Sequence, residues 1–91
     1  KIYLHQNYPN PFNPITSIRY DLSENAFVNI TVYDMLGKVV KTLVNGSRTA
    51  GSNTVDWDAT NAKNETVSAG LYVFAIQSGE LKQTKKMLLV K

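Results

Sequence analysis

Residues 17–22 read Ser-Ile-Arg-Tyr-Asp-Leu, so apolar side chains alternate with polar or charged ones. Successive side chains of a β-strand point to opposite faces, and this alternation predicts a strand with one buried face and one solvated face. The same alternation recurs at residues 28–33 and 54–58. These three stretches predict a protein built from short amphipathic strands.

Three further stretches depart from simple alternation. Residues 71–76, Leu-Tyr-Val-Phe-Ala-Ile, are apolar throughout, which predicts a central strand covered on both faces. Residues 82–90 begin polar and end apolar, which is typical of an edge strand whose lysines discourage pairing with other chains. Residues 36–44 also fit an apolar helical stripe. Their β-branched residues favour the strand, and the helix stays an alternative.

Turn-forming residues separate these stretches. Turn signals occur at residues 34–37, 45–47, 50–52 and 78–80. Gly37 and Gly70 are interpreted as structural positions where the backbone needs a positive φ. About seven short strands joined by such turns predict an all-β fold, an antiparallel immunoglobulin-like β-sandwich.

The beginning of the chain is rich in proline and asparagine. Pro9, Pro11 and Pro14 lack a backbone N–H, so residues 7–14 are expected to form an irregular extended segment. We expect a linker segment over residues 1–14, followed by the sandwich over residues 15–91. A proline-stiffened segment loses little entropy on docking, which suits partner binding. The alternative is that the prolines only cover the open end of the sandwich.

Composition limits the class of protein. The 91 residues suffice for one domain with a modest core, and 43% of them are hydrophobic, which is too many for a disordered chain. Cysteine is absent, and the net charge of +3 is typical of solvated surface lysines rather than a nucleic-acid-binding surface. No stretch approaches the roughly twenty apolar residues of a membrane-spanning helix, so no membrane insertion is expected. The chain begins at Lys1 without Met, as expected of a piece of a longer polypeptide.

Catalytic and metal-binding patterns are weak. His5 is the only histidine, and the sequence has neither a nucleophile elbow nor a glycine loop for phosphate. We therefore expect no enzyme activity, no catalytic residue, no metal and no cofactor. The loop from Asp56 to Glu65 holds enough oxygen ligands for Ca²⁺ but lacks the EF-hand spacing, so calcium binding there remains an alternative.

Aromatic residues could form a sugar-binding platform. Trp57 could combine with some of the tyrosines Tyr3, Tyr8, Tyr33 and Tyr72. Trp57 alternates in phase with Val55, however, which favours a place in the core. Tyr8 and Tyr33 are the better candidates for exposure.

Five motifs in order resemble the type A C-terminal sorting domains of type IX secretion systems. They cover nearly the whole chain: residues 4–14 with Tyr-Pro-Asn-Pro, residues 18–22, residues 32–40 with Tyr-Asp and Gly-Lys, residues 69–74 with Gly-Leu-Tyr, and the basic and apolar tail at residues 86–91. The immunoglobulin-like domain of flagellar hook-capping proteins is a related family that shares the Tyr-Asp-x-x-Gly and Trp-Asp patterns. The Asn-Pro-Phe-Asn-Pro opening and the tail favour the sorting family.

The resemblance implies a non-enzymatic domain that directs a parent protein across the outer membrane and attaches it to the cell surface. Its expected partners are the type IX translocon, a surface peptidase-transferase and a cargo domain that precedes it in the parent chain. The protein would then be secreted, passing through the periplasm to the cell surface or medium. The expected contact residues are Tyr8, Pro9, Asn10, Pro11, Lys86, Met87, Leu88, Leu89, Val90 and Lys91.

Two other functions remain open at this point. One is a carbohydrate-binding accessory module, and the other is an immunoglobulin-like structural domain of a flagellar cap or surface protein. The terminal strand could also be purely structural, because Met87 and Leu89 are expected to pack in the core.

Overall fold

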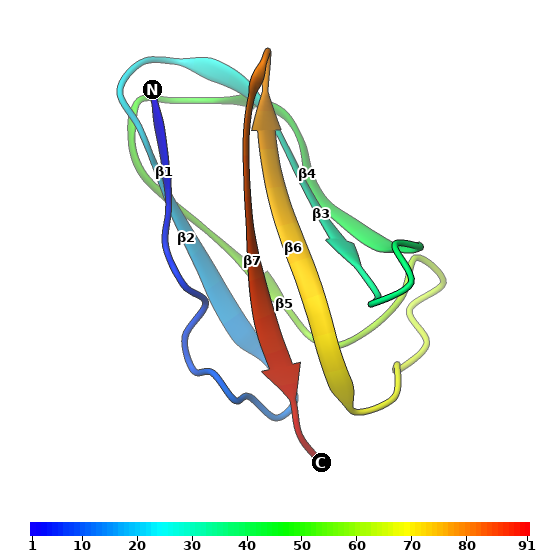
Figure 1. Cartoon of the computed structure of the whole chain (residues 1–91). Helices are drawn as coiled ribbons and strands as arrows, with labels where there is room; N and C mark the ends of the chain where they lie inside the picture. Colours follow the sequence, from blue (N-terminus) through cyan, green and yellow to red (C-terminus); the bar gives the residue numbers. More distant parts are fainter.

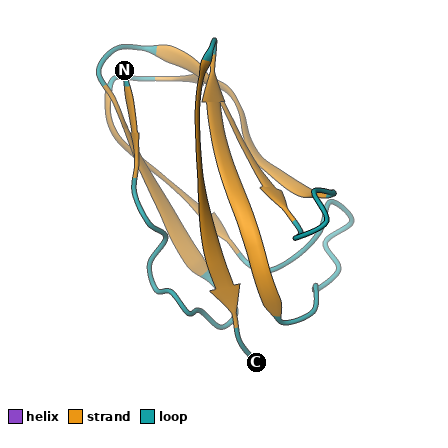
Figure 2. Ribbon diagram, viewed as in Figure 1, coloured by secondary structure: helices purple, strands orange, loops and turns teal.

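The computed structural model describes all residues, 1–91, and consists of seven strands joined by loops and turns, with no helix (Figure 2). It therefore contains no helix that could cross a membrane. The strands in chain order are β1 (Ile2–Leu4), β2 (Thr16–Leu22), β3 (Ala26–Tyr33), β4 (Val39–Arg48), β5 (Gly51–Trp57), β6 (Gly70–Ser78) and β7 (Leu81–Leu89).

The strands form two antiparallel sheets that face each other (Figure 1). One sheet has the order β1-β2-β5 and the other has the order β4-β3-β6-β7. The alternating stretches lie where expected, with β2 paired to β5 and β3 paired to β4 and β6. The predicted all-β sandwich is confirmed.

The core fills the space between the sheets. Ile18 and Tyr20 of β2 face the four-stranded sheet, and Ile30 of β3 and Phe74 of β6 face the three-stranded sheet. Each of these four side chains is at most 1% exposed. Trp57 is also 1% exposed, and its indole N–H donates to the carbonyl of Thr60 at 2.9 Å. The expectation that Trp57 is a core residue is confirmed. Burying the indole with its N–H bonded avoids the cost of an unpaired donor.

Strand β6 is central in its sheet, as expected, but its outer face is not fully covered by other residues. β6 lies between β3 and β7, so it is a central strand. Leu71 on its outer face is nevertheless 47% exposed, so the expectation that both faces are covered is wrong there. The fold has only two layers, and nothing packs over the outside of the four-stranded sheet at that point.

Residues 36–44 form a turn and the start of β4, which confirms the strand and excludes the helix. The pairing of β4 with β3 shifts register twice, between Ile30 and Thr31 and between Val32 and Tyr33. Each shift breaks the period of two. As a result Val40, Leu43 and Val44 all contact the core, and this spacing resembles a helical stripe. The turn expected at residues 45–47 is wrong, because they continue β4.

Gly37 and Gly70, the two glycines interpreted as structural, have positive φ. Gly37 has φ +86°, and its N–H donates to the carbonyl of Asp34 at 3.0 Å, which closes the expected turn. Gly70, with φ +147°, begins β6. A Cβ at either position would meet no atom within 4 Å, so the backbone angle alone favours glycine there.

The first fourteen residues belong to the sandwich. Ile2–Leu4 pair with β2, and Tyr8 forms an isolated bridge with Ser17. Asn7 is 2% exposed and Phe12 is 1% exposed. Residues on both sides of the boundary expected after residue 14 therefore contact the same core.

Candidate partner-binding edge

The proline-rich segment runs beside the end of β7 (Figure 1). The N–H of Phe12 donates to the carbonyl of Leu88 at 3.0 Å, and the N–H of Val90 donates to the carbonyl of Phe12 at 2.9 Å. Phe12 and Leu89 form a parallel bridge. The Phe12 ring enters the core, where its centroid is 5.8 Å from that of Trp57. The two segments expected to contact partners are thus neighbours in space.

Two side-chain amides extend this attachment. Asn10 Oδ1 accepts a hydrogen bond from the N–H of Leu88 at 2.9 Å. Gln6 Nε2 donates to the carbonyl of Lys86 at 2.7 Å. Together with Phe12, they occupy backbone groups on the open edge of β7 between Lys86 and Val90. We call this composite surface, residues 6–12 and 86–91, the terminal edge.

A buried amide holds the proline-rich segment in shape. Asn7 Nδ2 donates to Thr16 Oγ1 at 2.9 Å and to the carbonyl of Pro9 at 3.2 Å. Thr16 Oγ1 in turn donates to the same carbonyl at 2.8 Å. These bonds satisfy buried polar groups and fix the path of the chain through Pro9. Sequence reasoning missed Asn7 and Phe12, and the apolar ring between two prolines was the only signal available.

The expected contact residues divide into two groups. Tyr8 is 81% exposed, and Pro9, Asn10, Pro11, Lys86, Val90 and Lys91 are exposed as well, with Leu88 half-buried. Met87 and Leu89 are each 1% exposed and belong to the core. Their side chains cannot touch a partner of the folded domain, which agrees with the structural role considered for them.

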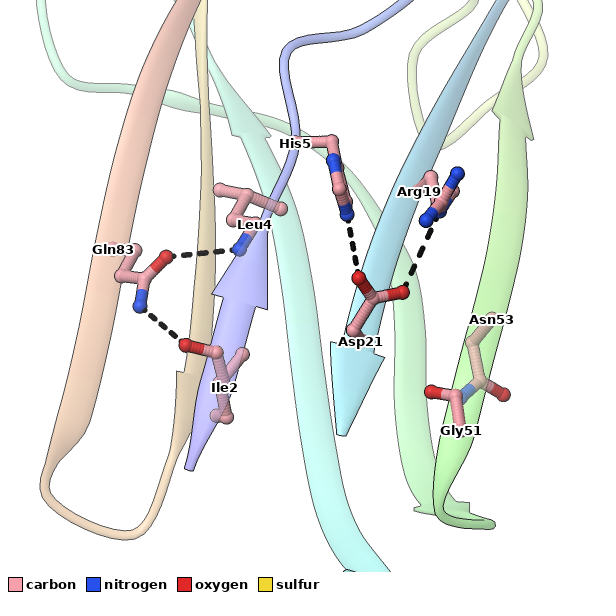
Figure 3. A network of polar contacts seen from close by, with 8 residues as sticks. All are labelled: Ile2, Leu4, His5, Arg19, Asp21, Gly51, Asn53 and Gln83. Carbon is pink, nitrogen blue, oxygen red and sulfur yellow. Dashed lines mark hydrogen bonds and ion pairs between the residues drawn. The ribbon is translucent and has the colours of Figure 1, made fainter. Parts of the chain in front are cut away.

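Gln83, near the start of β7 and away from the terminal edge, joins the two sheets. Gln83 Nε2 donates to the carbonyl of Ile2 at 2.7 Å, and Gln83 Oε1 accepts from the N–H of Leu4 at 3.0 Å (Figure 3). The side-chain amide thereby occupies the edge of β1 as a neighbouring peptide group would. Both β1 and the end of β7 are therefore closed to further pairing at these positions.

The outer face of the three-stranded sheet carries a small charged cluster. His5 Nε2 lies 2.7 Å from Asp21 Oδ2, and Arg19 Nε lies 3.5 Å from Asp21 Oδ1 (Figure 3). The hydrogen bond from His5, with a smaller contribution from Arg19, lowers the pKa of the Asp21 carboxyl. The cluster lies on the surface and links β2 to the residue that follows β1.

The acidic loop is held by its own hydrogen bonds. Ser17 Oγ donates to Asp56 at 2.6 Å, and Asn61 Nδ2 donates to Glu65 at 3.0 Å. Asp58 accepts from Thr60 Oγ1, which is the main reason that its pKa is lowered. The carboxylates turn to different partners, and no group of three or more acidic or histidine side chains is arranged to hold a metal ion.

The aromatic platform considered for sugars is not formed around Trp57. Trp57 and Tyr72 are buried and pack edge to face, with ring centroids 5.3 Å apart. Tyr3 and Tyr8 are the strongly exposed tyrosines, while Tyr33 is half-buried. A glycan could reach the exposed tyrosines but not the indole.

The family described as the FlgD Ig-like domain matches residues 14–81, which is most of the chain. The chain belongs to the FlgD Ig-like domain family. No curated protein matches this FlgD Ig-like domain significantly. The terminal edge lies outside the matched residues.

Solved structures share the fold of this FlgD Ig-like domain. Dimeric latent PorU from Porphyromonas gingivalis matches with a TM-score of 0.73 and 19% identity, over 99% of this chain and 9% of PorU. PorZ, an essential surface component of the type IX secretion system of P. gingivalis, matches with a TM-score of 0.65 and 19% identity, over 99% of this chain and 11% of PorZ. FlgD from P. aeruginosa matches with a TM-score of 0.64 and 25% identity, over 81% of this chain and 57% of FlgD.

The chain thus spans about a tenth of the length of PorU and PorZ. At 19% identity these likenesses show the fold alone.

Proposed function

We propose that this FlgD Ig-like domain is a non-enzymatic sorting and attachment domain of a secreted bacterial protein that uses type IX secretion. Its partners would be the outer-membrane translocon and a surface peptidase-transferase, and its cargo would precede it in the parent chain. The domain would act in the periplasm, at the outer membrane and at the cell surface.

The observation that carries the proposal is the terminal edge. Segments about eighty residues apart in the sequence, which carry the first and the last of the sorting-type motifs, lie together through four hydrogen bonds. A translocon that accepts many cargos needs to recognise one surface that is present only on the folded sorting domain. A surface built from both ends of the domain meets that requirement, because it disappears when the domain unfolds. The fold that the chain shares with part of PorZ is consistent with this role.

An export assay tests the proposal. Residues 1–91 are fused behind a Sec signal and a fluorescent protein in a bacterium with type IX secretion. We expect fluorescence at the surface or in the medium, and its loss in a translocon-null strain. Fluorescence that stays in the periplasm with the domain folded would contradict the proposal.

Exposed tyrosines give a matched pair of variants within this assay. Tyr8 is 81% exposed on the terminal edge, and Tyr3 is 61% exposed on β1. Both changes remove surface area with little effect on the core. We expect Tyr8→Ser to reduce export and Tyr3→Ser to leave it unchanged, with the same midpoint of thermal unfolding for both. Equal export by the two variants would remove Tyr8 from the recognised surface.

The family match supports a second candidate, a structural domain of a flagellar cap or surface assembly. The match covers residues 14–81, and FlgD structures share the fold. A structural domain should associate with copies of itself or with neighbouring subunits and should not direct export. Light scattering after gel filtration measures the first property, and the export assay measures the second.

A further inference from the structure

The outer face of the four-stranded sheet carries a row of short side chains, and it is hollowed where this row reaches β6 and β7. Strand pairing aligns four short side chains in one row: Thr42 lies opposite Thr31, Thr31 opposite Ala75, and Ala75 opposite Thr84. Thr31 and Thr42 contact each other through their hydroxyls at 3.4 Å, so both lie on the same face. This row crosses all four strands and forms the floor of what we call the sheet trough.

Longer side chains stand on both sides of the floor. On one side, pairing aligns Val39, Tyr33, Val73 and Lys86. On the other side it aligns Asn45, Asn29, Gln77 and Lys82. The sheet trough therefore has an apolar wall and an amide wall, with a lysine at the β7 end of each. The turn from Asp34 to Gly37 deepens it into a hollow of about 370 Å³ that Lys82 also lines.

The charge of the sheet trough is positive. Lys82 and Lys86 take part in no ion pair. Asp34 also lines the hollow and is outnumbered by the two lysines; one of its carboxylate oxygens accepts from the N–H groups of Leu36 and Lys38, both at 2.9 Å. The two lysines are four residues apart along β7, which places their Cα atoms about 13 Å apart. A carboxylate at the β7 end of the trough would lie between them.

Exposed apolar side chains extend the apolar wall. Val39 is 62% exposed, Met35 is 51% exposed and Leu36, on the adjoining turn, is 89% exposed. Clustered exposure of this kind is typical of a surface that binds a partner. The amide wall supplies donors and acceptors suited to the unpaired backbone of an extended chain.

We propose that the sheet trough binds an extended acidic peptide segment of a partner protein. About four residues span the distance between the outer strands, because strands are about 4.8 Å apart and an extended chain advances about 3.3 Å per residue. The apolar side chains of the segment lie against Tyr33 and Val73, its backbone bonds to the amide wall, and the carboxylate at its β7 end lies between Lys82 and Lys86. This surface shares only Lys86 with the terminal edge, and its binding does not depend on export.

Fluorescence anisotropy on the 91-residue chain tests the proposal. The probe is a labelled peptide of alternating Glu and Val, and the comparison peptide alternates Lys and Val. We expect binding of the acidic peptide only, with an affinity that falls as salt increases, because exposed charge pairs are screened. Equal binding of both peptides would overturn the proposal.

Charge-reversal variants locate the site. The double change Lys82→Glu and Lys86→Glu should weaken binding roughly 2- to 25-fold, since each exposed charge pair contributes roughly 1.4- to 5-fold. Lys63→Glu, on an exposed loop outside the trough, alters the net charge by the same amount per residue and should have no comparable effect. An effect of Lys63→Glu equal to that of Lys82→Glu alone would show that net charge attracts the peptide, and would overturn the proposal.

A second variant fills the trough without altering charge. Thr84 is exposed on the edge strand, so Thr84→Tyr should fold and block the floor. We expect loss of peptide binding with an unchanged thermal midpoint. Undiminished binding by the folded variant would overturn the proposal. So would binding of neutral oligosaccharides in place of the peptide, independent of salt, which would assign the trough to glycans.

Discussion

Replacing Gln83 with alanine should lower the free energy of unfolding by about 1–3 kcal/mol. The side-chain amide makes two hydrogen bonds to β1, to the carbonyl of Ile2 at 2.7 Å and from the N–H of Leu4 at 3.0 Å. A hydrogen bond contributes about 0.5–1.5 kcal/mol net to stability, and both bonds are lost together. In a domain of this size a loss of about 2 kcal/mol lowers the thermal midpoint by about 8–16 °C.

Urea unfolding followed by Trp57 fluorescence measures this change. Trp57 is the only tryptophan and is buried, so its emission reports on the core between the sheets. Gln77→Ala is the matched control, because Gln77 is an exposed glutamine on the neighbouring strand β6. If Gln83→Ala and Gln77→Ala differ by less than about 0.5 kcal/mol, the amide bridge does not hold β1 in place.

Gln83→Glu separates the two bonds. The carboxylate still accepts from the N–H of Leu4 but faces the carbonyl of Ile2 without a proton to donate. We expect a loss of stability at neutral pH that is partly recovered below about pH 4, where the carboxyl becomes protonated. A loss independent of pH would indicate that the donor to Ile2 is not important.

Three further changes test other parts of the structure. Phe12→Ala should lower the free energy of unfolding by about 3–5 kcal/mol in the same urea assay, because removing a ring that is 1% exposed leaves a cavity. A loss below about 1 kcal/mol would show that the proline-rich segment is not anchored in the core. Asn10→Ala should cost about 1 kcal/mol and increase amide hydrogen exchange at Leu88, whose N–H loses its acceptor; unchanged exchange would contradict the bond. Hydrogen bonding lowers the folded-state pKa of Asp58, so its contribution to stability is present above its ordinary pKa and is lost as the pH falls through the lowered value. Asp58→Asn should therefore reduce the fall in thermal midpoint between about pH 5 and pH 2. An unchanged fall would assign acid unfolding to other groups.

The sandwich could be predicted because burial leaves a direct pattern in the sequence. At residues 17–22 each apolar side chain faces the other sheet, so the alternation of apolar and polar residues matches the alternation of buried and more exposed side chains. β4 shows where this fails. Two register shifts turn Val40, Leu43 and Val44 to the same side, and local spacing then indicates a helix as readily as a strand.

The terminal edge could be predicted only in part. The motifs identified both segments, but their contact depends on bonds between residues 78 to 80 positions apart, such as Asn10 to Leu88 and Gln6 to Lys86. A polar side chain that bonds a distant backbone group has no periodicity and no local partner. Asn7 illustrates the same limit, because its burial follows from the path of the chain rather than from its residue type.

The position of the two chain ends has a mechanical consequence. Lys1 and Lys91 lie at opposite ends of the sandwich, whose longest dimension is 37 Å (Figure 1). Tension between them would pull β1 along β2 and β7 along β6, parallel to the strands. The hydrogen bonds between these strands would then carry the load simultaneously, whereas pulling at the end of a hairpin breaks them one after another. The domain is therefore arranged to resist stretching along its long axis while remaining folded.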